Sequence, residues 1–371
     1  MSKTAKITGI VVLLLVIFFV FFLIRRHNRL QQLKGGQAQG QATQTPINPT
    51  QAPNQEGSVV IWGACGFPQK CDGNFISSES QLGRTFAVAK TYHTITTPGL
   101  TANDQSLVSS GHSLLYSIDP PSPNPTGGTG LGRYSYYKLN DIAAGKYDQQ
   151  ILNQLTQLNG TATTPYLIFD GEAENLLELQ ACSEAPKNTA TTPNYAKCGP
   201  EFVAAWKHVR DLIKQHGLNR IQMVWTMTAK SYQNDLSIID AYFPGEANVD
   251  WLGVDGYNQD CGSKSGSYAQ DTFEKIYSAT IAWHDAHLPN KPISITEWGA
   301  PVGPNGDSDR VTWLQAAASS AKKWPSIQMM AYWDGGKSAK TFSGCDFTIT
   351  PDQPSFQTFK SIGLDLYFGK R

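Results

Sequence analysis

The sequence lacks an excess of charge of either sign. Its 371 residues include 30 Lys and Arg against 30 Asp and Glu, so the formal net charge is zero, and charged residues make up only 16% of the chain. A nucleic-acid-binding protein normally carries a basic excess on its binding domain, so this composition argues against nucleic acid as a partner. Aromatic residues make up 11%, which is too many for a disordered chain.

Several short motifs of catalysis and cofactor binding are also absent. The sequence has no GxxxxGK[ST] phosphate loop and no GxSxG nucleophile elbow, and the glycine-rich stretch 127–132 lacks the GxGxxG spacing. His284 and His287 are three residues apart without an HExxH pattern, so they are not expected to bind zinc. We therefore expect no obligatory metal and no cofactor.

One long apolar run stands near the amino terminus. Residues 7–24 read ITGIVVLLLVIFFVFFLI and contain no charge. Helical residues rise about 1.5 Å each, so this run spans roughly 27 Å, just enough for the hydrocarbon core of a bilayer. A cleaved signal peptide would have a shorter apolar region and a small-residue cleavage site. Residues 1–30 are therefore predicted to form a single-pass membrane anchor, with a cleaved signal as the alternative.

The cysteines indicate on which side of the membrane the body of the protein, residues 58–371, lies. The basic residues that flank the apolar run weakly favour a cytoplasmic body. All six cysteines lie in the body, and they are Cys65, Cys71, Cys182, Cys198, Cys261 and Cys345. An even number without CxxC spacing suits disulfides in an oxidising compartment, although buried free thiols are the alternative. The body is therefore predicted to be extracytoplasmic.

Short-range disulfide pairing would join Cys65 to Cys71 and Cys182 to Cys198, which would leave Cys261 with Cys345. Residues 31–57 are rich in Gln, Thr, Pro and Gly. Such a segment cannot bury a core, so it is predicted to be a flexible linker between the membrane and the body.

The body, residues 58–371, alternates short apolar runs with helical stretches. Eight runs are predicted to be strands: 58–64, 85–90, 112–118, 165–170, 220–226, 250–257, 292–298 and 327–334. Their near-continuous apolar character is typical of parallel strands buried on both faces. Segments 202–217 and 272–288 are among the helices predicted between them. This pattern predicts an α/β fold, a (β/α)8 TIM barrel, with a doubly wound open sheet as the alternative.

Carboxylates lie at the carboxyl ends of predicted strands, where a (β/α)8 barrel has its active site. Glu297 lies at the end of the seventh predicted strand, and Glu172 and Glu174 follow the fourth. A carboxylate embedded in an apolar strand is costly unless it is hydrogen-bonded or functional. Each of them is therefore a catalytic candidate, with a structural carboxylate at the barrel rim as the alternative.

Two glutamates on opposite sides of a barrel mouth suit glycoside hydrolysis. One protonates the departing glycosidic oxygen, and the other attacks the anomeric carbon or activates a water molecule. A carboxyl separation of about 5–5.5 Å would predict retention of configuration, and about 6.5–9.5 Å would predict inversion.

Aromatic residues at strand ends also fit a sugar site, because aromatic faces pack against the apolar C–H faces of pyranose rings. The candidates are Trp62, Trp225, Tyr257, Trp298 and Trp333, although core packing explains any one tryptophan equally well. Segment 119–138 is long and rich in Pro and Gly, so it is either a functional loop or a mobile insertion.

These pieces occur in an order that resembles glycoside hydrolase family 26, the β-mannanase-like members of the large retaining (β/α)8 clan. The matching segments are 139–151, 166–175, 202–226, 242–258 and 291–300.

The resemblance implies roles for individual residues. Glu172 would be the acid/base and Glu297 the nucleophile. Tyr257 would hydrogen-bond the nucleophile, and Trp333 would lie below the reacting sugar.

The acid/base strand departs from the family pattern, which is usually His-Glu-Met-Asn-Gly. Here Gly171 stands in place of the His and Glu174 in place of the Asn. In a second register Glu174 is the acid, followed by Asn175. In the first register both Glu174 and Asn175 are predicted to bind substrate.

The resulting hypothesis is a monomeric, membrane-tethered retaining glycoside hydrolase that cleaves β-linked polysaccharide outside the cell. The alternative is a catalytically inactive glycan-binding relative displayed on the same tether.

Overall fold

The computed structural model describes residues 60–67, 79–125, 134–185, 193–258, 271–335 and 346–369. The predicted anchor and linker lie outside these ranges, as do Cys71, Cys261 and Cys345. Within the described ranges no helix is both long and apolar enough to cross a bilayer. The anchor, the linker and the extracytoplasmic location therefore stay predictions.

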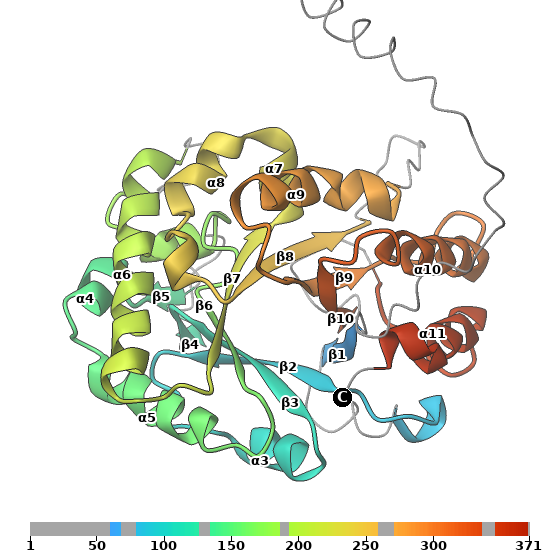
Figure 1. Ribbon diagram of the computed structural model, residues 1–371, viewed down its shortest axis with the longest axis horizontal. Coiled ribbons are helices and arrows are strands. Elements are labelled where there is room, and N and C mark those ends of the chain that lie inside the picture. The colour runs from blue at the N-terminus through green and yellow to red at the C-terminus, as the bar shows by residue number, and fades with distance from the viewer. Residues whose placement is uncertain are drawn as a thin grey trace, which may run out of the picture. The chain divides into compact units, whose positions relative to one another are not determined.

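Eight parallel strands close into a barrel in the order β1-β10-β9-β8-β7-β6-β3-β2 (Figure 1). The strands are β1 (Ile61–Phe67), β2 (Val88–Thr94), β3 (Ser113–Asp119), β6 (Tyr166–Phe169), β7 (Gln222–Thr228), β8 (Trp251–Tyr257), β9 (Ile293–Gly299) and β10 (Ile327–Gly335). All eight predicted strands are present, with ends shifted by a few residues. The closed barrel confirms the TIM-barrel prediction and excludes the doubly wound open sheet.

Helices cover the outside of the barrel (Figure 1). They are α3 (Ala102–Ser109), α4 (Leu139–Ala143), α5 (Asp148–Asn159), α6 (Tyr195–Gln215), α7 (Ala229–Asn234), α8 (Leu236–Tyr242), α9 (Phe273–His287), α10 (Asp307–Ala321) and α11 (Pro354–Leu364), with 3-10 turns η2 (Glu178–Ala181), η3 (Glu246–Asn248) and η4 (Leu366–Phe368). The predicted helix 272–288 coincides with α9. In the segment predicted as a long loop, β4 (Pro121–Pro125) and β5 (Tyr134–Tyr136) form an antiparallel pair.

Helix α6 begins at Tyr195 rather than at the predicted residue 202. Its additional turns include Gly199, which lies against α8. A Cβ at this position would come within 2.4 Å of the carbonyl oxygen of Ala241, so only glycine lets the two helices approach this closely.

Alternation along the strands separates two apolar layers. Ile61, Val88, Leu115, Ile168, Val224 and Trp251 are among the side chains of a cluster inside the barrel. The alternate strand positions pack outward against the helices in a second, larger cluster. Side chains two residues apart share a face of a strand. Lys90 and Tyr92, which continue the series that starts at Val88, therefore point into the barrel at its carboxyl end.

Three of the tryptophans predicted to bind sugar belong to the outer layer. Trp62, Trp225 and Trp298 are 1%, 0% and 0% exposed. The rings of Trp62 and Trp298 pack edge to face with centroids 5.5 Å apart, and Trp225 packs on Trp283 of α9 at the same centroid distance. The sugar-binding prediction for these three residues was wrong, because strand alternation directs them between the barrel and the helices.

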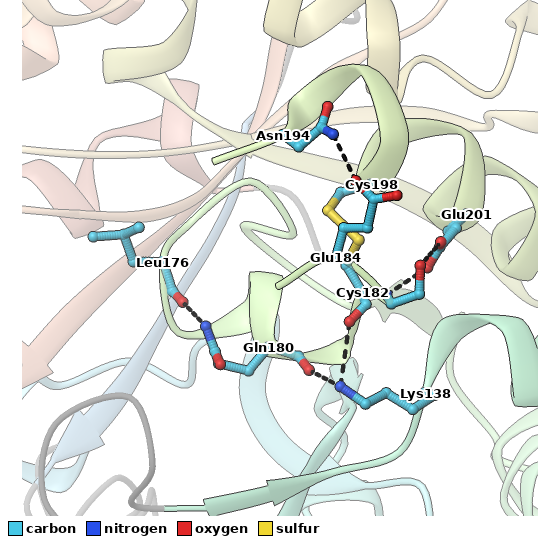
Figure 2. Close-up of a disulfide and its surroundings, with 9 residues drawn as sticks. Lys138, Leu176, Gln180, Cys182, Glu184, Asn194, Cys198 and Glu201 are labelled. Carbon is cyan, nitrogen blue, oxygen red and sulfur yellow. Dashed lines mark hydrogen bonds between the residues drawn. A yellow bond between two sulfur atoms is a disulfide. The ribbon is translucent and has the colours of Figure 1, made fainter. Parts of the chain in front are cut away.

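A disulfide joins Cys182 to Cys198, as predicted, and ties the segment after η2 to the first turns of α6 (Figure 2). Lys138 donates a hydrogen bond to the carbonyl oxygen of Cys182 at 3.2 Å, and Glu201 accepts one from the backbone nitrogen of Ser183 at 2.8 Å. These contacts anchor the chain that follows β6. Cys65 is also disulfide-bonded, while the other predicted pairings stay predictions.

Removing the disulfide with the double substitution Cys182→Ser and Cys198→Ser is expected to destabilise the protein. The two cysteines are 16 residues apart, and closing a loop of about this length stabilises a fold by about 3 kcal/mol. For a domain of this size, the Tm measured by calorimetry should fall by roughly 5 °C. A double variant that melts at the wild-type Tm would show that the hydrogen bonds alone hold this segment.

Candidate active site

Glu297 enters the barrel interior through a β-bulge in β9. Val254 of β8 pairs with Ile295, and the next paired residues are Asp255 and Glu297, so Thr296 is an extra residue in β9. Without the bulge Glu297 would share the face of Ile295, which belongs to the outer layer. Bulges commonly re-aim a side chain beside an active site. Here the bulge turns Glu297 inward, and the Thr296 hydroxyl donates a hydrogen bond to Asp255.

Three donors from two other strands hold the Glu297 carboxylate, whose side chain is 13% exposed. Lys90 Nζ and the Tyr92 hydroxyl each lie 2.5 Å from Oε1. The Tyr257 hydroxyl donates to Oε2, which is the hydrogen bond that the family resemblance implied. Sequence reasoning missed Lys90 and Tyr92. A lysine at the end of an apolar strand was the available signal.

Glu172 lies in the turn that follows β6, where the backbone adopts a rare conformation. Asp170 and Glu172 have φ values of 52° and 55°, and non-glycine residues at positive φ often mark functional sites. The half-buried Glu172 side chain accepts a hydrogen bond from Asn175 at 3.0 Å. Burial and the neighbouring charge of Glu297 raise the pKa of Glu172 to about 7, so this carboxyl group can still hold a proton near neutral pH.

Glu174 has different surroundings. It is 4% exposed, and its Oε1 accepts hydrogen bonds from the Thr228 backbone nitrogen at 2.8 Å, the Thr228 hydroxyl at 2.7 Å and the Ser231 hydroxyl at 2.9 Å. These bonds fasten the turn after β6 to the start of α7. The contacts are those of a structural carboxylate, and they favour the register in which Glu172 is the acid.

A cavity of about 860 Å³ opens beside these residues, a volume typical of ligand sites. Glu172, Asn175, Asp255 and Tyr257 are among the residues that line it, and it continues over polar side chains of α7 and the start of α9. Trp333 lies beside Tyr257, with ring centroids 5.7 Å apart. Of the predicted substrate-binding residues, Glu174, Asn175 and Tyr257 line this cavity, and Trp333 lies next to it.

A group of buried acids that the sequence did not reveal lies close to Glu172. Asp170 is 0% exposed, and neither of its carboxylate oxygens has a hydrogen-bond partner. Burial and nearby acids raise the pKa values of Asp170 and Glu178 well above the usual range, and burial raises that of Asp119 to about 6. Within the described residues no cluster of His, Cys, Asp and Glu has the geometry to hold a metal ion.

Asp170→Asn is expected to stabilise the protein at neutral and alkaline pH. A raised native pKa means that, above about pH 4, the native state binds more protons than the unfolded state, so wild-type stability falls as pH rises. The amide has a similar shape and does not titrate. Melting curves should give equal Tm values near pH 4 and a Tm several degrees higher for the variant near pH 8. The matched control is Asp240→Asn, since Asp240 is exposed. If the gain in Tm of Asp170→Asn is the same at every pH, the interpretation is contradicted.

Comparison by sequence relates part of the chain to a known protein. No family model matches it. Endoglucanase H of Acetivibrio thermocellus is 27% identical over 133 residues, which cover 36% of this chain. The match spans only 14% of the length of that curated relative.

Three solved structures share the architecture. The family 26 glycoside hydrolase domain of an endo-β-mannanase/endo-β-glucanase from Prevotella bryantii has a TM-score of 0.55 and 14% identity, over 84% of this chain and 90% of that one. A modular endo-β-1,4-mannanase from Cellulomonas fimi gives 0.53 and 17%, over 84% and 72%. A family 26 β-mannanase from Bacteroides ovatus gives 0.55 and 15%, over 84% and 90%. The fold of this chain therefore resembles that of the family 26 glycoside hydrolases.

Proposed function

We propose that this chain, which shares the fold of the family 26 glycoside hydrolases, is a retaining glycoside hydrolase acting on β-mannan or β-glucan. The observation that carries the proposal is the pairing of two unlike glutamates at the carboxyl end of the barrel. Glu297 is held by three donors, and Glu172 has a pKa raised to about 7.

In the first half of the reaction Glu297 attacks the anomeric carbon while the glycosidic C–O bond breaks. Glu172 gives its proton to the departing oxygen, so the leaving sugar departs as a neutral alcohol. The product of this step is a glycosyl ester on Glu297 and an ionised Glu172.

In the second half Glu172 acts as the base. Formation of the ester removes the negative charge of Glu297, which is one of the causes of the raised pKa of Glu172. The Glu172 pKa therefore falls when it must serve as a carboxylate. Glu172 takes a proton from water, the oxygen of that water attacks the anomeric carbon, and Glu297 leaves as a carboxylate that its three donors stabilise.

The substrate class rests on the cavity and on the structural neighbours. Polar and charged residues outnumber apolar ones in the cavity lining, which suits a hydroxyl-rich ligand. The neighbours are named as mannanases, one of them also as an endo-β-glucanase. We place the activity outside the cell, on a monomer tethered by residues 1–30. The apolar run 7–24 and the Cys182–Cys198 disulfide support that location, because disulfides persist in oxidising compartments.

The wild-type protein should be assayed on mannan, mixed-linkage glucan and xylan, with the anomeric configuration of the first product followed by proton NMR. We expect hydrolysis of mannan or glucan with a β-configured first product. An α-configured first product would contradict the double displacement. Binding of the polysaccharides without release of product would favour the inactive glycan-binding relative.

The alkaline side of the pH profile should report on Glu172. The enzyme needs Glu172 protonated to release the leaving group, and the pKa of this group is raised to about 7. The value of kcat/KM is therefore expected to fall about tenfold per pH unit above this value. A profile that stays flat to pH 9 would contradict the assignment of Glu172 as the acid.

A further inference from the structure

Lys90 is a buried charged side chain that the two-glutamate mechanism leaves unused. It is the third residue of β2, and its side chain is 3% exposed. Its Nζ is 2.5 Å from Oε1 of Glu297 and 3.7 Å from Oδ2 of Asp255. Strand alternation explains why it points inward, because it follows Val88 by two residues.

Lys90 balances the charge of a site that is otherwise acidic. Glu172, Asp255 and Glu297 come together here, and each carboxylate raises the cost of ionising the next. Burial alone would lower the pKa of Lys90, but Asp255 and Glu297 outweigh this effect and raise it. The lysine therefore stays a cation across the pH range of an assay.

The groups that face Glu297 come from several elements. They are Lys90 and Tyr92 of β2, Glu172 after β6, and Asp255 and Tyr257 of β8. Tyr277 of α9 lies in the outer layer but is within electrostatic reach of Glu297. The tyrosines remain neutral, since burial and the nearby carboxylates raise their pKa values well above the usual range. Burial and the charge of Glu297 likewise raise the pKa of Asp255. Lys90 is the member of this set that carries positive charge.

We propose that Lys90 is a positioning residue that keeps Glu297 ionised and oriented for attack on the anomeric carbon. The inference rests on the proposed glycosidase function. A buried carboxylate that loses its ion-pair partner takes up a proton at higher pH. The ammonium group and the Tyr92 hydroxyl share Oε1, so Lys90 also restricts the direction in which the carboxylate points.

The test is the acidic limb of the pH profile in two variants. In Lys90→Met, which removes the charge but keeps much of the bulk, the limb of kcat/KM on an activated aryl glycoside should move up by about 1–3 pH units. Activity should fall by about 10- to 1000-fold on the acidic side and recover in part as the pH rises. Lys90→Arg, which keeps the charge, should leave the limb in place even if kcat drops. Lys146→Met, which removes an exposed lysine of a surface ion pair, is the control. If Lys90→Met does not fold, Lys90→Gln carries the same expectation.

A readout that needs no turnover separates this inference from the proposed function. Protein labelled with carbon-13 at the glutamate carboxyl groups is titrated by NMR, and the Glu297 resonance is assigned by its loss in Glu297→Gln. Its titration midpoint should rise in Lys90→Met. If the wild type is active, and Lys90→Met changes neither the acidic limb of kcat/KM nor the Glu297 resonance, the inference is overturned and the proposed function stands. An inactive wild type whose resonance still moves supports the charge coupling and overturns the function.

Discussion

Glu297→Gln is expected to lower kcat/KM by on the order of 10⁴-fold or more on every β-glycoside, whatever its leaving group. The amide cannot form the glycosyl ester, so both halves of the double displacement fail. Because the first half fails, improving the leaving group should not help. The loss is measured on an aryl glycoside and on the polysaccharide found active in the substrate panel.

The matched control for this substitution is Glu246→Gln, since Glu246 is an exposed glutamate of η3. It should retain wild-type rates. Far-ultraviolet circular dichroism should show that Glu297→Gln remains folded. Residual activity within tenfold of wild type on polysaccharide would mean that Glu297 is not the nucleophile.

Glu172→Ala is expected to separate substrates by their leaving groups. The variant cannot protonate the departing oxygen, a contribution of roughly 10²–10⁴-fold. Hydrolysis of polysaccharide should fall by this amount, whereas formation of the glycosyl ester from an activated aryl glycoside should survive. Azide can replace the water that Glu172 no longer activates, so added azide should restore turnover and yield a glycosyl azide. Burst kinetics and product analysis measure these two effects.

Glu174→Ala provides the contrast that distinguishes the two registers. Removing its three hydrogen bonds to Thr228 and Ser231 should lower the Tm without creating any dependence on the leaving group. If azide instead rescues Glu174→Ala, and Glu172→Ala is near wild type, the acid lies two residues further along the chain than we assign it.

Much of the fold could be predicted from local patterns in the sequence. Apolar runs of strand length, separated by helical periodicity, predicted all eight strands of the barrel, because strands buried on both faces must be apolar throughout. The same apolar pattern does not show which face of the strand an individual residue lies on. Trp62, Trp225 and Trp298 lie within such runs, and nothing in an all-apolar strand distinguishes its inner face from its outer face. Only the closed barrel showed that these tryptophans face the helices.

The candidate site, too, could be predicted from the sequence only in part. The sequence by itself determined which glutamates stand at strand ends, because a carboxylate that interrupts an apolar run is conspicuous. It did not determine that Glu297 points inward. Strict alternation from Ile295 would have turned it toward the helices, and the bulge at Thr296 reverses that direction. A bulge depends on how two strands pair, and the partner residues lie far away in the chain.

Lys90 shows the same limit. It is 207 residues from Glu297 in sequence, yet its Nζ contacts the Glu297 carboxylate. The composition of β2 makes the strand, but closure of the barrel brings this ammonium group to the acids. The sequence therefore determined the elements and the type of chemistry, through residue periodicity and polarity. The tertiary structure alone decided which charges meet, because the position and orientation of buried side chains depend on strand pairing and barrel closure.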